Sequence, residues 1–161
     1  GKVSLPTTIE HWYRLCPEVD DVSNALETIL ARHDRLLVVL SDDAASKEVA
    51  ADSIRALASP TTVVGYAGDR VSDGSRAEKA VLVAGLADCR GLDVPELQAV
   101  VIVGPVVPSP TWYVHVSGRV GRFGRPGCCY SLLHSTSDLG SDRPEKLLSM
   151  ANLLGVRLHL F

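Results

Sequence analysis

Short apolar runs alternate with amphipathic stretches along the whole chain. The runs are rich in β-branched and aromatic residues, and we predict a strand in each of 9–16, 36–41, 61–67, 80–86, 99–107 and 128–133. The run LLVVLS at 36–41 is continuously apolar, which is typical of a strand buried on both faces of a sheet. Strands that alternate with helices indicate an α/β domain with a mostly parallel sheet and right-handed crossovers.

Apolar residues recur at helical spacing between these runs, in 20–33, 42–57 and 141–156. Residues 112–120 also favour a short helix, although valine lowers the helix propensity there. The predicted N-caps are Asp20 or Asp21 for the first helix, an Asp of the pair at 42–43 for the second, and Ser141 or Asp142 for the last. Pro144 should lie in the first turn of the last helix, and Gly155 should end it.

Composition sets outer limits on the function. The 161 residues, 46% of them hydrophobic, suit one domain spanning 1–161. A net charge of −3 excludes bulk electrostatic attraction to nucleic acid, so any such contact must be local. The sequence has no membrane-length apolar run and no signal peptide, which predicts a soluble intracellular protein with no membrane partner. Nucleus, cytoplasm and mitochondrion all stay open.

The four cysteines show no metal-binding spacing. Cys16, Cys89, Cys128 and Cys129 form no CxxC or Cys/His pattern, so we predict no zinc or other metal site. Cys128 and Cys129 are neighbours in a predicted strand, and their side chains should point to opposite faces. We therefore expect reduced thiols.

Candidate chemistry gathers in the loops. Residues 113–127, YVHVSGRVGRFGRPG, alternate Arg119, Arg122 and Arg125 with glycines. Arginine binds phosphate well because its planar fork donates several hydrogen bonds, and neighbouring glycines let the backbone approach a ligand closely. We expect functional groups at the carboxyl ends of the strands, where Asp42 and Asp43 follow one predicted strand and ADCRGLDVPEL follows another.

Two segments carry a family resemblance. VLVAGLADCRGLDVPEL at 81–97 and YVHVSGRVGRFGRPGCCYSLL at 113–133 resemble motifs V and VI of the C-terminal RecA-like domain of DEAD-box ATP-dependent RNA helicases. The resemblance extends from about Thr8 to about Leu154. It implies a RecA-like parallel β-sheet sandwiched between helices in three αβα layers. It also implies a partner, an N-terminal RecA-like domain of the same protein, which this chain does not contain.

The resemblance implies roles for individual residues. Arg119 and Arg122 match the two arginine fingers that reach the γ-phosphate of ATP, and they are the implied catalytic residues. The other implied contacts are Asp93 and Gly91 for the nucleotide, and Arg90, Gly118 and His115 for RNA. The implied cofactor is ATP, with Mg²⁺ bound through the missing N-terminal domain and nothing held by this domain alone. RNA and RNA-processing proteins are the other implied partners.

The same residues also have structural interpretations. Arg119 and Arg122 could be solvated surface charges, and His115 could be a half-buried packing residue. Asp93 could cap a turn ahead of Pro95. Trp112, Tyr113 and Tyr130 are predicted to be packing aromatics rather than base-stacking platforms.

The chain departs from the family pattern at several positions. Gly85-Leu86 replaces the Thr-Asp of motif V, and Val116 and Val120 replace an Arg and a Thr of motif VI. Asp88 replaces an alanine and is expected to repel RNA. The segment between about 68 and 80 is shorter than in the family, with Arg76 as a candidate substitute for its lost arginine.

Two functions therefore stay open. The domain is half of an active ATP-dependent RNA helicase, or it is a degenerate, non-catalytic RNA-binding or scaffold module in RNA processing or ribosome maturation. A different superfamily 2 helicase or translocase is a weaker third alternative. In each case we predict that the isolated domain is inactive as an ATPase.

Overall fold

The computed structural model describes residues 5–42, 45–67, 77–89, 92, 94, 96–121, 126–134 and 144–161. The strands are β1 (Ile9–Leu15), β2 (Arg35–Leu40), β3 (Val63–Tyr66), β4 (Ala80–Gly85), β5 (Ala99–Gly104), β6 (Gly127–Leu133) and β7 (Leu158–Leu160). The helices are α1 (Val19–Arg32), α2 (Lys47–Leu57), α3 (Pro110–Ser117), α4 (Pro144–Leu154) and the 3-10 helix η2 (Leu86–Cys89). Each predicted strand and helix overlaps one of these elements.

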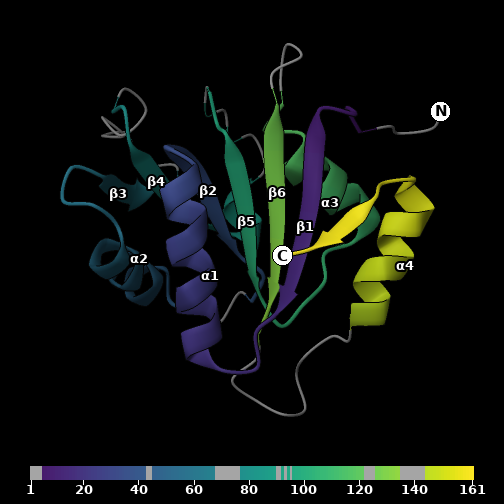
Figure 1. The fold of residues 1–161 in the computed structure, drawn as a ribbon, viewed down its shortest axis with the longest axis horizontal. Helices are drawn as coiled ribbons and strands as arrows, with labels where there is room; N and C mark the ends of the chain where they lie inside the picture. Colours follow the sequence, from purple (N-terminus) through teal and green to yellow (C-terminus); the bar gives the residue numbers. More distant parts are fainter. Residues whose placement is uncertain are drawn as a thin grey trace.

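The strands form one parallel sheet in the order β3-β4-β2-β5-β6-β1-β7. Helices α1 and α2 lie on one face of the sheet, and α3 and α4 lie on the other (Figure 1). The predicted αβα layering is therefore confirmed, and the fold is RecA-like.

The core is divided by the sheet into two layers. All six residues of β2 are buried, as its continuous apolar run predicts. Leu37 and Val39 pack on the α3 side, whereas Leu36 and Val38 pack on the α1 side. Cys129 lies in the α3 layer and Cys128 packs against the α1 layer, so their predicted opposite orientation is confirmed. All four cysteines are free thiols.

Two predicted helix starts are wrong. Helix α1 begins one residue before Asp20, with Glu18 as its N-cap, and the Asp21 carboxylate accepts the Glu18 N–H at 2.9 Å from inside the first turn. Helix α2 begins only at Lys47, because the Ser46 hydroxyl accepts the Val49 N–H at 3.2 Å. The predicted caps Ser141 and Asp142 lie outside the described residues.

Backbone conformation explains where strand β5 and helix α4 end. Strand β5 stops at Gly104 instead of continuing to 107, since Gly104 has φ of 141° and its missing side chain leaves room for Ser41 Oγ. Helix α4 begins at Pro144 and is followed by Gly155 at φ 69°, as predicted. The short strand β7 was not predicted. No described helix is both long and apolar enough to cross a bilayer.

A buried histidine links two strands and a helix beneath the α3 layer. His11 of β1 is 3% exposed, and its Nδ1 lies 2.7 Å from the hydroxyl of Tyr113 in α3. Tyr113 also hydrogen-bonds Cys129, the residue paired with His11 in the sheet. Burial, with a smaller contribution from His159, lowers the pKa of His11 from 6.5 to about 4.

We therefore expect His11 to make the stability of the domain depend on pH. The folded domain keeps the imidazole neutral, whereas the unfolded chain binds a proton below about pH 6.5, so stability falls as pH drops from about 6.5 to 4. From pH 7 to 5 the loss from His11 is about 2 kcal/mol. Urea unfolding at both pH values should show a smaller loss in His11→Gln, because glutamine does not titrate. His33, whose pKa burial also lowers, contributes equally to both proteins. Equal losses would contradict the assignment.

Candidate functional site

The segments that resemble motifs V and VI meet on the α3 face of the sheet. Residues from the loop after β4 share one apolar cluster with residues of α3 and the turn that follows it: Cys89, Val94, Leu97, Tyr113, Val116 and Val120. Segments 16 or more residues apart in the chain therefore pack into one buried cluster. The packing between the two segments is apolar.

Helix α3 leads directly into the turn that contains the candidate Arg119. The Ser109 hydroxyl accepts the Trp112 N–H at 3.3 Å, and Pro110 occupies the first turn, so the sequence fixes where the helix begins. Gly118 is the C-cap, and its N–H donates to Val114 O at 3.0 Å. Gly118 therefore has a described structural role in ending the helix, one residue before Arg119.

Arg119 lies on the surface next to His115. A terminal guanidinium nitrogen of Arg119 donates to His115 Nε2 at 2.8 Å. Because arginine has no acceptor and stays charged, Nε2 must be unprotonated for this hydrogen bond to form. His115 is exposed and Arg119 is partly exposed, so the interpretation of His115 as a half-buried residue is wrong. The pair leaves the positive charge of Arg119 accessible to solvent.

The turn that contains Arg119 does not lie at the edge of the sheet where we expected functional groups. Helix α3 runs back from the end of β5, and the turn after Arg119 lies at the amino end of β6, where a Cβ at Gly127 would meet Val120 and Gly121 at 2.7–2.9 Å. Only the turn after β4 and the residues after β2 lie at carboxyl ends. The Arg119 turn and the turn after β4 therefore lie at opposite edges of the sheet, because α3 crosses the face of the sheet between them.

The turn after β4 is held by Asp88. Its carboxylate accepts Lys47 Nζ at 2.9 Å and the Gly85 N–H at 3.0 Å. These two hydrogen bonds, first that of Lys47, hold the pKa of the Asp88 carboxyl below its usual range. The negative charge that we expected to repel RNA is balanced by Lys47.

Arg119 also interacts with this turn electrostatically. Burial raises the pKa of the Cys89 thiol to about 11 with a further contribution from Asp88, and the positive charge of Arg119 opposes both. The Cys89 thiol donates to Gly85 O at 3.3 Å. Arg119 and Cys89 are therefore close enough for the charge of Arg119 to affect the thiol.

The departures from the family pattern have structural counterparts. Val116 is 0% exposed and Val120 is 1% exposed, so both side chains belong to the core beneath α3. Leu86 is partly buried against the same cluster and offers no polar group. Tyr113 and Tyr130 are fully buried and Trp112 packs against the cluster, which confirms the prediction of packing aromatics.

Four predicted site residues, Arg90, Gly91, Asp93 and Arg122, lie outside the described residues, as do Arg76 and Arg125. Their proposed roles stay predictions. The structure adds His11 to the site as an anchor of α3. Sequence reasoning missed it, because one histidine in a strand pattern gives no sign of burial. Within the described ranges, no group of three or more His, Cys, Asp or Glu could hold a metal ion.

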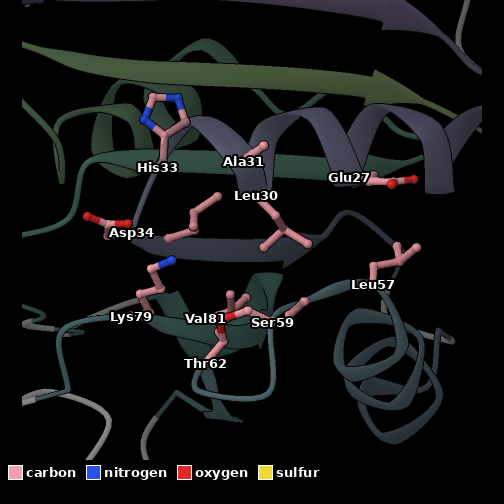
Figure 2. Close-up of a pocket in the computed structure, with 12 residues that line it drawn as sticks. Glu27, Leu30, Ala31, His33, Asp34, Leu57, Ser59, Thr62, Lys79 and Val81 are labelled. Atoms are coloured by element: carbon pink, nitrogen blue, oxygen red, sulfur yellow. Dashed lines mark hydrogen bonds between the residues drawn. The ribbon is translucent and has the colours of Figure 1, made fainter.

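A separate cavity lies at the amino end of β2. It has a volume of about 310 Å³, and its lining includes His33, Asp34, Leu57, Thr62 and Lys79 (Figure 2). These residues come from the ends of α1 and α2 and the segments next to β2, β3 and β4. Its lining comes from the α1 and α2 side of the sheet, the face opposite α3, so this cavity is no part of the α3 site.

Comparison with known proteins agrees with the motif assignment. The Helicase conserved C-terminal domain family matches residues 69–124. Nucleolar RNA helicase 2-A of Xenopus laevis is 48% identical over 52 residues, which cover 32% of this chain and 7% of the relative. ATP-dependent RNA helicase DBP5 of Kluyveromyces lactis is 39% identical over 72 residues, which cover 41% of this chain and 15% of the relative.

Solved structures extend the similarity of fold to almost the whole chain. The C-terminal domain of the DEAD-box protein Dbp5 aligns with a TM-score of 0.70 and 21% identity, covering 95% of this chain and 89% of that one. Dbp5 of S. cerevisiae bound to RNA and ADP BeF3 aligns with a TM-score of 0.73 and 19% identity, covering 98% of this chain and 42% of that one. Residues 69–124 are thus similar to the helicase C-terminal domain family, and the fold of almost the whole chain is similar to that of the C-terminal domain of a DEAD-box protein.

The matched segments span only a small part of the curated relatives, 7% and 15% of their lengths in the two cases above. The helicase C-terminal domain family matches residues 69–124 of this chain. Within that portion, Arg119 and His115 belong to the matched range 69–124, whereas His11 lies before it.

Substitution of Gly127 should test how tightly the Arg119 turn is packed. In Gly127→Ala the new Cβ would meet the backbone nitrogen of Gly121 at 2.7 Å, so the turn or β6 must shift. We expect a loss of about 1–3 kcal/mol in urea unfolding. The control is Gly65→Ala, whose Cβ would meet only Leu82 at 3.8 Å and should cost far less. Equal stabilities of the two variants would contradict the described packing.

Proposed function

We propose that this domain is the C-terminal half of an ATP-dependent RNA helicase and that Arg119 is one of its arginine fingers. The observation that carries the proposal is the accessible charge of Arg119. The two ion pairs found among the described residues are Lys47–Asp88 and Arg55–Asp52, and Arg119 takes part in neither. Its described partner is a neutral imidazole, which a phosphate oxygen can replace at little electrostatic cost.

In the proposed mechanism an N-terminal RecA-like domain supplies the rest of the active site. ATP, with its Mg²⁺ held by that domain, supplies the phosphoryl group whose transfer drives RNA remodelling. Closure of the two domains on RNA and ATP brings Arg119, and by resemblance Arg122, to the γ-phosphate, where guanidinium groups stabilise the developing charge. Asp93 and Gly91 contact the nucleotide, and Arg90, Gly118 and His115 contact RNA. RNA binding and hydrolysis are then coupled through closure.

His115 fits a switching role in this scheme. When Arg119 turns toward a phosphate, its hydrogen bond to His115 Nε2 is released, and the exposed imidazole becomes available to RNA. The rigid elements behind the pair, Tyr113 and Val116 in the core, keep α3 in place while the side chains move.

Arg119→Ala in the full-length protein is expected to reduce the RNA-stimulated ATPase kcat by about 10²-fold or more, with little change in RNA affinity. The measurement is steady-state ATPase activity with saturating RNA. Arg55→Ala, which removes a surface arginine already paired with Asp52, is the matched control and should retain activity. An unchanged kcat in Arg119→Ala would remove this residue from the active site. The 161-residue chain alone should show no ATPase activity above background.

A second function has its own support. Gly85 and Leu86 lack the hydroxyl and carboxylate found at these positions in the family, and Leu86 is packed against the core. The position of Val116 faces the core, so no side chain there could reach RNA. These features favour a non-catalytic RNA-binding or scaffold module in RNA processing or ribosome maturation. An intact P-loop and acidic motif upstream in the gene would favour the active helicase, and their loss would favour the module.

Restoring the Thr and Asp of motif V at positions 85 and 86 should distinguish an active helicase from a non-catalytic module. A Cβ at Gly85 would lie 3.4 Å from Asp88 Oδ2. Gly85→Thr adds the hydroxyl, and Leu86→Asp adds the carboxylate. For a helicase with a weakened RNA grip we expect RNA-stimulated ATPase activity of the full-length double variant to rise about fivefold or more. No rise, in a variant that still unfolds cooperatively, would favour the non-catalytic module. Val116→Arg is unsuitable because it would bury a charge.

A further inference from the structure

One half of the sheet has an unusual surface on the side opposite α3. Figure 1 shows α1 and α2 in front of the β3–β5 half, whereas no described helix lies in front of β6, β1 and β7. Sheet register places Trp12 between Tyr130 of β6 and His159 of β7 on one face. We call this surface the ring face and define it by Trp12, Arg14, Arg32, Tyr130, His159 and Phe161.

Aromatic rings cover the ring face in a connected cluster. The Trp12 and His159 ring centroids are 5.0 Å apart at an interplanar angle of 39°. Phe161 meets the edge of Trp12 at 6.5 Å and the edge of Tyr130 at 5.3 Å. Tyr130 is buried, but Trp12, His159 and Phe161 are each partly exposed. The exposed members therefore form a connected aromatic surface of tilted and edge-on rings.

Two arginines lie among these rings. The guanidinium carbon of Arg14 is 4.4 Å from the Phe161 ring centroid, and that of Arg32 is 5.3 Å from it. Arg14 Nε also donates to the Phe161 carbonyl at 2.9 Å, which fixes the guanidinium plane beside the ring. Neither arginine takes part in the two side-chain ion pairs found among the described residues, Lys47–Asp88 and Arg55–Asp52. The ring face thus combines preorganised cations with exposed aromatic planes.

A cavity continues the ring face toward the amino ends of the strands. Its volume is about 500 Å³, and its lining includes Glu10, Arg32, His33, Gln98 and Cys128. Arg32 belongs to both surfaces, and Glu10 and Cys128 precede Trp12 and Tyr130 by two residues on the same strands. A ligand that follows the exposed strands would therefore pass from the rings into the cavity without crossing a helix.

We propose that the ring face binds single-stranded RNA, with bases stacked on Trp12 and His159 and phosphates bound by Arg14 and Arg32. The proposal rests on the proposed function for its choice of ligand. Aromatic planes with neighbouring cations are the combination that binds single strands without sequence preference, because every base has a π-face and every linkage carries a charge. An open sheet face suits extruded bases, which a duplex does not offer. A purely apolar peptide would leave the two guanidinium groups without charged partners.

This RNA site would be separate from the helicase cleft. Arg119 and α3 lie on the opposite face of the sheet, beyond the buried strands β5 and β6. A strand bound at the ring face could stay attached while the two RecA-like domains open. RNA binding at the ring face would compensate for the hydroxyl and carboxylate that Gly85 and Leu86 do not provide.

The two tryptophans of the chain allow a direct test. Trp12 lies on the ring face, and Trp112 lies in α3 on the other face. Trp112→Phe leaves Trp12 as the fluorescent reporter, and Trp12→Phe leaves Trp112. Both 161-residue variants are titrated with an oligouridylate of about 15 nucleotides at low salt. We expect quenching in Trp112→Phe and no change in Trp12→Phe, because stacking quenches the ring that contacts a base.

A charge reversal gives a second measurement that misfolding cannot mimic. Glu10 is exposed, and its carboxylate accepts Trp12 Nε1–H at 3.2 Å, so it is the acid nearest the rings. Glu10→Lys should tighten RNA binding about threefold or more, with the gain shrinking as salt rises. Glu27→Lys, the same change on α1 facing the α2 side, is the matched control and should have less effect.

Quenching of Trp12 together with tighter binding by Glu10→Lys would support the ring face as an RNA site. Quenching of Trp112 alone would place RNA on the α3 face and overturn the inference while leaving the proposed function intact. If RNA changes neither reporter, the inference also fails, and the ring face is better tested as a protein-docking surface. If both reporters respond, equal effects of Glu10→Lys and Glu27→Lys would overturn it. The ATPase test of Arg119 decides the proposed function independently.

Discussion

Burial of apolar side chains on both faces of a parallel sheet is the interaction on which the rest of this domain depends. Strand β2 is buried at every position, and its odd and even residues belong to different core layers. Each layer needs its own helices, which is why the chain must cross the sheet repeatedly and in parallel. Functional groups can then appear only where the chain leaves a strand or passes over a face.

The candidate site follows from that constraint. The loop after β4 and helix α3 both cover the same side of the sheet, so they must pack against each other, and they do so through Cys89, Val116 and Val120. Arg119 and His115 stay at the surface because the opposite side of α3 supplies the apolar contacts. The buried His11–Tyr113 hydrogen bond then fixes the helix against β1.

Charged and polar side chains lie on two opposite faces of the sheet. On the α3 face, one accessible arginine and its neutral histidine partner lie beside a turn whose carboxylate is already paired with Lys47. On the other face, helix coverage stops at β5, and aromatic rings with cations take its place over β6, β1 and β7. The motif V segment has therefore lost polar residues on one face, while aromatic rings with cations lie on the other.

The sequence by itself determined the alternation of strands and helices, the doubly buried β2 and the two motifs, because these depend on local periodicity and on residue types at fixed spacing. It also predicted a short helix over 112–120, whereas the structure ends α3 at Ser117, before Arg119. Only the tertiary structure decided that Glu18 and Ser46 are the caps, since capping depends on which side-chain oxygen reaches a free N–H. The same holds for the burial of Val116, the His11 anchor, the amino-end position of the Arg119 turn and the uncovered ring face. Each of these depends on contacts between residues far apart in the chain, and such contacts leave no periodic trace in the sequence.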